Sequence, residues 1–264
     1  GKAMASDIFR CFLLQAVFTV GSIFLFGFLI GWCNRRFYAN FGRYGRTVCI
    51  LTGIVGTPVH EGAHALACLL FGHRIQEIRL FSINPEDGVL GYVRHSCNPR
   101  NFYHRIGNFF IGTAPVVVIS LLFALIAYLL LPEMFLKAMQ EVSEADFGKF
   151  GSALVGFWNG LSVIFSYAGR PAWWVFLFLG VLFCLHMSLS KADVKGALDG
   201  LFFLLLLYAL TDTVLGLLGD GILFSFTRGF LSAAGFMTYF LLISLLLSVC
   251  AVAISWLFRA LKRR

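Results

Sequence analysis

The stretch Gly53-Ile-Val-Gly-Thr-Pro-Val-His-Glu-Gly-Ala-His-Ala-Leu-Ala-Cys-Leu-Leu-Phe-Gly72 places His60, Glu61 and His64 in a run that is otherwise apolar enough to cross a bilayer. On a helix the two histidines, four residues apart, project from one face and can both bind one zinc ion. Glu61 beside them can accept a proton from water. Burying a carboxylate at membrane depth costs about 2.5 to 3.5 kcal/mol even on lenient insertion scales, so an ionisable cluster here indicates a functional site. The stretch predicts zinc-dependent hydrolysis within a membrane.

Two other interpretations of these three residues stay open. A His-Glu-x-x-His match also occurs by chance in soluble proteins, usually on a solvated helix. A degenerate or purely structural metal site would keep the histidines without using Glu61. The apolar setting favours the catalytic interpretation over both, because a chance cluster of this kind would be costly to bury.

The composition is that of a polytopic membrane protein. Of the 264 residues, 59% are hydrophobic and 13% are charged, and the mean hydropathy is +0.84. These values lie far outside the range of soluble globular domains. The formal net charge of +8 fits basic residues that flank the spans and meet anionic headgroups. We therefore expect the lipid bilayer as a partner and no binding to nucleic acid.

Apolar runs of about 20 residues predict about six membrane spans. They lie at 11–33, 47–72, 106–131, 173–189, 197–218 and 236–258. The segment 151–168 is also apolar, but glycines interrupt it and Arg170-Pro171 ends it. We predict an amphipathic or re-entrant helix there, inside an extracytoplasmic loop at 133–170, with a seventh span as the alternative. The fold class is thus an α-helical polytopic membrane protein with one membrane domain, 1–264, whose C-terminal helix and basic tail occupy 236–264.

A short β-hairpin is predicted after the metal-binding helix. Residues 74–83 roughly alternate between polar and apolar, residues 84–88 have the composition of a turn, and residues 89–95 resume the strand-like pattern. The hairpin at 74–95 has a free edge, and such an edge can hold an unwound peptide by strand addition.

Two histidines do not complete a catalytic zinc site, which usually has three protein ligands. The candidates for the third lie in Leu185-His-Met-Ser-Leu-Ser-Lys-Ala-Asp-Val-Lys-Gly-Ala-Leu-Asp-Gly200, where one span ends and a new helix begins. Asp193 is close to a helix start capped by Ser190, which suits an anion. Asp199 lies further into apolar sequence and is costlier to leave unpaired.

The chain resembles the site-two protease family of intramembrane zinc metalloproteases over roughly residues 47–210. The segment His60-Glu-Gly-Ala-His-Ala-Leu-Ala, followed by Phe71-Gly-His-Arg-Ile-Gln-Glu-Ile-Arg-Leu-Phe81, looks like that family's metal helix running into its membrane-associated sheet. Ile111-Gly-Thr-Ala-Pro115 is similar to the family's Gly-Pro helix start. The resemblance is to a divergent, bacterial-type member, and it implies an integral protein of the bacterial cytoplasmic membrane.

The resemblance also implies where the third ligand lies. In the family a later helix carries an Asn-x-x-Pro-x-Pro-x-x-Asp-Gly-like motif, whose Asp is the third zinc ligand and whose Asn helps to hold substrate. The literal Leu-Asp-Gly here contains Asp199, yet the spacing from the chain break fits Asp193 better. We predict Asp193 as the ligand, with Asp199 as the alternative. His186 falls near the family's Asn position, and we predict that it stabilises the transition state or is a fourth ligand, with capping or packing as the alternative.

Three further histidines are interpreted more simply. His73 ends the metal helix beside Arg74, which indicates a residue at the membrane surface rather than a ligand. His95 and His104 flank the hairpin and the third span, where a solvated loop is the first interpretation and a polar strip facing the substrate is the second.

The residues predict a membrane zinc hydrolase with Zn²⁺ as its cofactor, and the resemblance implies that it is an intramembrane endopeptidase. Its substrate would be a membrane protein or peptide, cleaved in or near a transmembrane segment. The alternatives are a non-proteolytic, metal-binding membrane regulator and a metal or proton transporter. Intact Glu61 argues against the first, and the strand-like insert has no use in the second.

Overall fold

The computed structural model describes residues 2–84 and 88–261, and this part of the chain is helical apart from one small sheet. The helices are α1 Lys2–Ala16, α2 Ser22–Asn40, α3 Gly45–Leu70, α4 Phe102–Leu130, α5 Pro132–Ser143, α6 Phe150–Ser166, α7 Pro171–Cys184, α8 Lys191–Leu218 and α9 Asp220–Leu261. A π-helical turn, Val17–Gly21, joins α1 to α2, and a 3-10 turn, Gly42–Tyr44, leads into α3. The strands are β1 Arg74–Arg79 and β2 Tyr92–Ser96.

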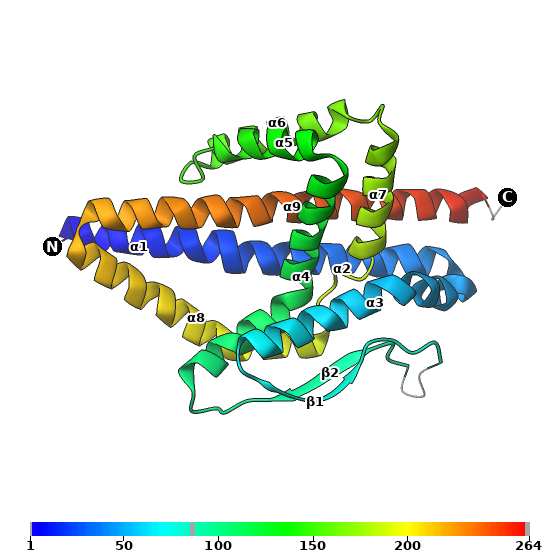
Figure 1. Cartoon of the computed structure of the whole chain (residues 1–264), viewed down its shortest axis with the longest axis horizontal. Helices are drawn as coiled ribbons and strands as arrows, with labels where there is room; N and C mark the ends of the chain where they lie inside the picture. Colours follow the sequence, from blue (N-terminus) through cyan, green and yellow to red (C-terminus); the bar gives the residue numbers. More distant parts are fainter. Residues whose placement is uncertain (1, 85–87, 262–264) are drawn as a thin grey trace.

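Two long helical rods form the frame of the molecule (Figure 1). The rod made of α1 and α2 lies beside α9, and both run in the same direction along the long axis. Helices α4 and α7 cross these rods, and α3 and α8 lie below them, each packed on α4, with the hairpin beneath α3. Helices α5 and α6 cover the opposite side. The chain therefore brings α3, α4, α8 and the hairpin together at one place.

Four helices are long and apolar enough to cross a membrane: Met4–Asn40, α4, α8 and α9. They correspond to four of the predicted spans, although α9 begins at Asp220 instead of near residue 236. The remaining predicted spans coincide with α3, which has 26 residues, and with the shorter apolar helix α7. This architecture is that of a helical membrane protein, while the count of six spans stays a prediction.

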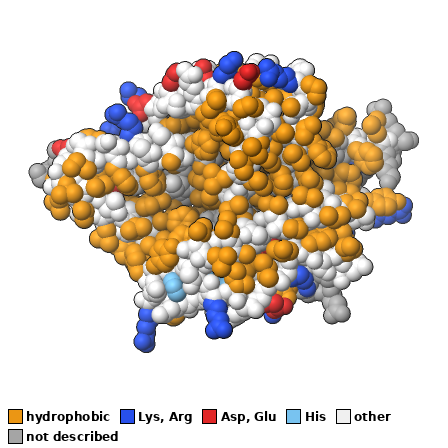
Figure 2. Space-filling model, in the orientation of Figure 1, with side chains coloured by type: hydrophobic (Ala, Val, Ile, Leu, Met, Phe, Trp, Pro, Cys, Tyr) orange, Lys and Arg blue, Asp and Glu red, His pale blue; other side chains and the backbone are white. Residues whose placement is uncertain are grey.

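The distribution of side chains on the surface also fits a membrane protein. Figure 2 shows hydrophobic side chains over the broad middle of one face, and charged side chains along the edge of α5 and α6 and along the hairpin edge. The segment predicted to be amphipathic or re-entrant, 151–168, is helix α6, which packs on α5. Gly156 allows this packing, because a Cβ there would lie 2.6 Å from the Cβ of Ala145.

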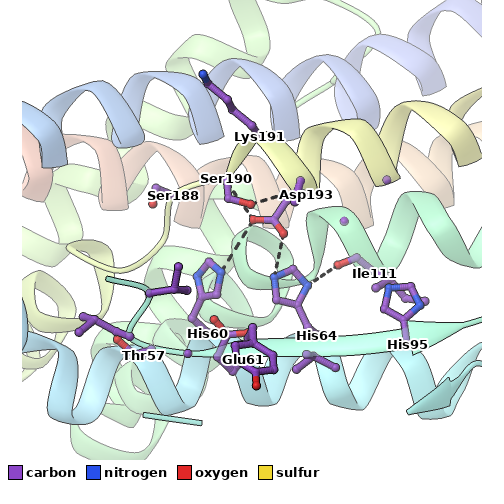
Figure 3. A pocket seen from close by; sticks show the side chains of 18 of the residues that line it. Thr57, His60, Glu61, His64, His95, Ile111, Ser188, Ser190, Lys191 and Asp193 are labelled. Carbon is purple, nitrogen blue, oxygen red and sulfur yellow. Dashed lines mark hydrogen bonds and ion pairs between the residues drawn. The ribbon is translucent and has the colours of Figure 1, made fainter. Parts of the chain in front are cut away.

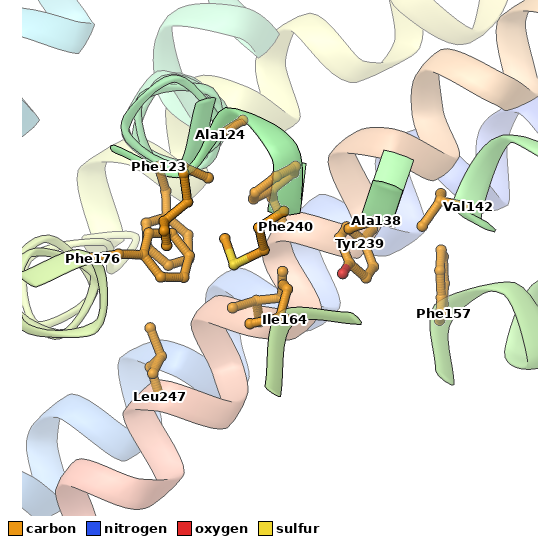
Figure 4. Packing of buried hydrophobic residues seen from close by; sticks show 14 of the residues in the cluster. Phe123, Ala124, Ala138, Val142, Phe157, Ile164, Phe176, Tyr239, Phe240 and Leu247 are labelled. Atoms are coloured by element: carbon orange, nitrogen blue, oxygen red, sulfur yellow. The ribbon is translucent and has the colours of Figure 1, made fainter. Parts of the chain in front are cut away.

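The main aromatic core fixes α7 against α4 and α9 (Figure 4). The rings of Phe123 and Phe176 stack with centroids 4.6 Å apart, and Phe240 meets Phe123 edge-on at 6.1 Å. Gly180 permits this contact, because a Cβ there would lie 2.5 Å from the Phe123 ring. Such aromatic pairs contribute about 0.5 to 1.5 kcal/mol each beyond the area they bury. Helix α7 is thereby held against α4 and α9.

The predicted hairpin at 74–95 is confirmed as a two-stranded antiparallel sheet. Arg74 pairs with Ser96 and Arg79 with Tyr92, with an irregularity between Ile75 and Glu77. The pairing continues past the strand ends, since the N–H of Ser82 donates to the carbonyl of Leu90 at 2.8 Å. The turn predicted at 84–88 lies partly outside the described residues, which omit 85–87.

Candidate metal centre

Helix α3 presents the two histidines side by side, as the four-residue spacing predicts. The ring centroids of His60 and His64 are 5.0 Å apart. The His64 side chain is buried, and Glu61, on the intervening position, is only 7% exposed. Pro58 lies inside the helix without ending it. The metal helix therefore carries its three ionisable residues toward the interior of the protein.

Two backbone carbonyls orient the imidazole rings. The Nδ1–H of His60 donates to the carbonyl of His186 at 2.8 Å, and the Nδ1–H of His64 donates to the carbonyl of Ile111 at 2.7 Å. A carbonyl only accepts, so each Nδ1 carries the proton and each Nε2 keeps its lone pair. Hydrogen bonds of this kind fix the tautomer and orientation of metal-binding histidines.

Asp193 faces both Nε2 atoms from the first turn of α8 (Figure 3). Its Oδ1 lies 3.2 Å from Nε2 of His64, and its Oδ2 lies 3.9 Å from Nε2 of His60. A capping box holds the carboxylate, because the N–H of Ser190 donates to Oδ2 at 2.7 Å and the N–H of Asp193 donates to Oγ of Ser190 at 3.1 Å. The predicted Ser190 cap is confirmed, and it gives the side chain one fixed direction.

The geometry of these three side chains fits a metal ion. Their ligand atoms all lie within 4.8 Å of one another, and in the described part of the chain these three residues form a group that could hold a metal ion. Zinc with ligands at about 2.0 to 2.2 Å in a tetrahedral arrangement keeps its ligand atoms roughly 3.4 Å apart. The separations of 3.2 and 3.9 Å lie on either side of that value. His60, His64 and Asp193 thus form a possible metal-binding triad.

Asp199, the alternative third ligand, is placed elsewhere. Arg105 donates from Nη2 to its Oδ1 at 3.0 Å, and Asn108 donates from Nδ2 to its Oδ2 at 2.5 Å. Both carboxylate oxygens are therefore engaged with helix α4. The structure brings Asp193, and not Asp199, to the histidines.

Close packing of α8 on α4 determines where Asp193 lies. A Cβ at Gly112 would be 2.3 Å from the carbonyl oxygen of Asp193, and a Cβ at Gly200 would be 2.3 Å from the backbone nitrogen of Phe109. Only glycine fits at two such backbone contacts. Gly112 lies in a segment that carried the family resemblance, and Gly200 follows Asp199 in the segment of third-ligand candidates. Their packing role is visible only once α4 and α8 are seen together.

His186 is adjacent to the centre, and its ring is turned away from the triad. Its Nε2 hydrogen-bonds to Oγ1 of Thr52 at 3.0 Å and lies 3.3 Å from the Tyr38 hydroxyl. Gly56 makes room for the ring, since a Cβ there would be 2.2 Å from Cδ2 of His186. Its carbonyl orients His60, which is a positioning role that the sequence did not reveal. The predicted role in transition-state stabilisation stays a prediction.

A cleft of about 640 Å³ opens on the triad. His60, Glu61 and His64 line it from α3, Asp193 lines it from α8, and the hairpin residues 89–93 form another wall. Gly91 lies directly against Glu61, because a Cβ there would be 2.7 Å from Cγ of Glu61. The hairpin thus closes over the residue beside the two histidines, a contact that no local sequence pattern indicates.

His73 is buried within the protein, and its predicted position at the membrane surface stays a prediction. This side chain is only 4% exposed, because the chain turns at Gly72 and folds His73 against the start of α4. His95 is predicted to lie in a solvated loop. It lies on strand β2 and lines the cleft. The second interpretation, a polar strip beside the substrate, is the one that its position favours.

Comparison with known proteins does not indicate a family or a function for this chain. No family model matches the chain, and no curated protein or solved structure matches it. Conclusions about function therefore depend on the residues and the geometry described above.

Proposed function

We propose that this protein is a zinc-dependent intramembrane endopeptidase of the site-two protease family. The observation that carries the proposal is the convergence of the two Nε2 atoms and the Asp193 carboxylate in a cleft that Glu61 also lines. A purely structural metal site has no use for a cleft or for a carboxylate beside it that binds no metal. We place the protein in a bacterial cytoplasmic membrane, as the resemblance implies.

Each residue has a distinct task in peptide hydrolysis. His60, His64 and Asp193 would hold zinc, a Lewis acid that acidifies water and polarises a carbonyl group. Glu61 takes the proton that water loses as its oxygen adds to the scissile carbonyl carbon. Glu61 then gives this proton to the nitrogen as the C–N bond breaks, which releases a neutral amine. The carbonyls of His186 and Ile111 keep both imidazoles in the required tautomer throughout.

The substrate we propose is a membrane protein or peptide in an extended conformation. A transmembrane helix hides its carbonyls in its own hydrogen bonds, so it must unwind before cleavage. Strand β2 pairs with β1 along one edge, and residues 89–93, which lead into it and begin it, line the cleft. An unwound segment can add to such an edge through main-chain hydrogen bonds.

Replacing Glu61 with Gln tests the proposal. Purified wild-type protein and the Glu61→Gln variant would be incubated with a panel of single-span reporter proteins in detergent micelles. We expect cleavage by the wild type and loss of cleavage by the variant, with equal zinc content in both, because Gln removes the base and keeps the ligands. Equal cleavage by both proteins would contradict the role of Glu61.

The two alternative functions predict different results for the purified protein. A non-proteolytic regulator would bind zinc and cleave none of the reporters. A transporter would move zinc across the membrane of a proteoliposome, in the direction set by the zinc or proton gradient. Neither alternative explains why Gly91 of the hairpin packs against Glu61.

A further inference from the structure

A second group of histidines lies beside the cleft and outside the metal triad. His73 follows α3, His95 belongs to β2, and His104 is in the first turn of α4. The ring of His73 lies 5.1 Å from that of His95 and 5.5 Å from that of His104, centroid to centroid. Of the three, His95 lines the cleft, and Figure 3 shows it on the His64 side of the triad.

The hydrogen bonds of this group determine where its protons are. Nε2 of His73 is 2.9 Å from the carbonyl of His104, and a carbonyl only accepts, so this nitrogen carries a proton. Nδ1 of His73 is 3.1 Å from Nδ1 of His95. In a neutral His73 this Nδ1 has only a lone pair, so the N–H between the two rings belongs to His95.

Both rings are neutral near pH 7. Burial lowers the pKa of His73 below its ordinary value, and the hydrogen bond to the His104 carbonyl opposes this shift only in part. Burial also lowers the pKa of His95, and repulsion from His73 and His64 lowers it further. A neutral His95 that uses Nδ1–H for His73 keeps its lone pair on Nε2. Among the described residues, no other hydrogen bond to the His95 ring is present.

We propose that His95 is a substrate-positioning residue whose Nε2 accepts a hydrogen bond from a backbone N–H of the extended peptide, and that His73 sets the tautomer this requires. The inference rests on the proposed function, since it concerns the peptide in the same cleft. An extended peptide presents an N–H at every residue other than proline, and each needs an acceptor once water is excluded. His95 supplies such an acceptor beside the metal triad, from the strand along which the peptide is proposed to lie.

The first test reads the tautomer directly and needs no substrate. Two-bond ¹H–¹⁵N correlation spectra of ¹⁵N-histidine-labelled protein in micelles distinguish Nδ1–H from Nε2–H rings, and a His95→Gln variant assigns the His95 signals. At neutral pH we expect His95 as the Nδ1–H tautomer. The His73→Phe variant should convert it largely to Nε2–H, because the acceptor on residue 73 is lost.

Two matched variants control for a general disturbance of the fold. His73→Asn can place its Oδ1 where Nδ1 of His73 lies, so it should keep His95 as Nδ1–H. His104→Gln keeps the backbone carbonyl that fixes His73, so it should also leave the tautomer unchanged. An Nε2–H ring at His95 in the wild type would overturn the inference.

The second test measures the hydrogen bond to the peptide. Acetohydroxamate can chelate the metal alone, whereas a peptidyl hydroxamate also occupies the cleft. His95→Phe should weaken the peptidyl compound about 3- to 10-fold, as expected for one lost hydrogen bond, and leave acetohydroxamate unaffected. N-methylation of the amide that donates to His95 should weaken binding to the wild type by the same factor as His95→Phe does. The same N-methylation should not weaken binding to the His95→Phe variant any further.

The outcomes separate the inference from the function on which it rests. If the wild type binds neither zinc nor acetohydroxamate, the proposed function fails, and the positioning role of His95 fails with it. If both bind and the peptidyl compound has the same affinity for wild type and His95→Phe, the proposed function survives and the inference is overturned. The inference would also be overturned if, for every amide tested, N-methylation weakened binding of the peptidyl compound to His95→Phe as much as it weakened binding to the wild type.

Discussion

Glu61 depends on Gly91 of the hairpin for its position beside the metal triad. A Cβ at residue 91 would lie 2.7 Å from Cγ of Glu61, 2.8 Å from the carbonyl oxygen of Arg79 and 2.9 Å from that of Leu80. The two carbonyls belong to the backbone and cannot turn aside, so any larger residue must move either the hairpin or Glu61. The base of the proposed reaction is thus placed by a residue that has no side chain.

The Gly91→Ala variant should therefore lose cleavage and keep its metal. We expect a reduction in kcat of at least about 100-fold, since a displacement of about 1 Å at a reacting group has effects of that size. Zinc content should equal that of the wild type, because the three atoms nearest to a Cβ at residue 91 belong to Glu61, Arg79 and Leu80 and not to a ligand. Gly62→Ala is the control, as a Cβ at Gly62 meets nothing within 4 Å. Unchanged kcat in Gly91→Ala would show that the hairpin does not position Glu61.

Buried His73 should make the folded protein less stable in acid. Its lowered pKa means that the unfolded chain, with an ordinary pKa of about 6.5, binds the proton more tightly. The stabilisation is fully present above about pH 6.5 and is lost as the pH falls through that value toward the folded pKa. The groups that face His73 are the ring of His95 on β2 and the carbonyl and ring of His104 on α4.

Thermal unfolding in detergent at pH 7.5 and pH 5.5 measures this effect. His73→Asn cannot take up a proton, so its Tm should fall less between the two pH values than that of the wild type. Groups that do not contact residue 73 titrate alike in both proteins, and the difference between the two falls reports His73 together with its effect on the pKa of the neighbouring His95. Equal falls in Tm would mean that His73 is not held neutral by burial.

At the scale of the elements, the site depends on how closely α8 approaches α4. Gly112 lets the backbone of Asp193 come within contact of α4, and Asp199 is tied to the same helix by Arg105 and Asn108. Gly112→Ala would push the first turn of α8 outward and carry the third ligand away from the histidines. We expect zinc affinity to fall about 10- to 100-fold, the range found when the groups that orient metal ligands are changed.

A zinc titration against a competing chelator checks this, with Gly196→Ala as the matched control on α8. A Cβ at Gly196 meets nothing within 4 Å, so this variant should bind zinc as the wild type does. Equal zinc affinity for Gly112→Ala and Gly196→Ala would contradict the role of the α4–α8 contact.

The packing of α1, α8 and α9 contains one fully buried acid. Asp212 is 0% exposed, and its Oδ1 accepts from Nε2 of Gln15 at 2.8 Å. Asp212→Asn keeps an acceptor for Gln15 and removes the possibility of a buried charge, so its Tm should equal or exceed that of the wild type. Asp212→Leu leaves Gln15 without this acceptor and should cost about 1 to 3 kcal/mol. Thermal unfolding of the three proteins gives the order, and a stable Leu variant would contradict it.

At the scale of the whole molecule, local patterns predicted more than distant contacts did. The His60-Glu-x-x-His64 helix, the Ser190 cap and the hairpin each depend on neighbours in sequence, and the structure has all three. The choice between Asp193 and Asp199 depends on how α8 packs on α4, which periodicity does not encode. Burial of His73 depends likewise on the turn at Gly72 and on α4. The span count could not be fixed, because apolar composition does not distinguish a span from a buried or surface helix.

The central claim is that His60, His64 and Asp193 hold one zinc ion, and metal analysis of purified variants tests it most directly. Zinc per protein chain would be measured by mass spectrometry for the wild type, His60→Ala, His64→Ala, Asp193→Asn and Asp199→Asn, each checked for folding by circular dichroism. We predict about one zinc per chain in the wild type and in Asp199→Asn, and almost none in the other three. Full zinc occupancy in a folded Asp193→Asn variant, or none in the folded wild type after incubation with zinc, would contradict the account.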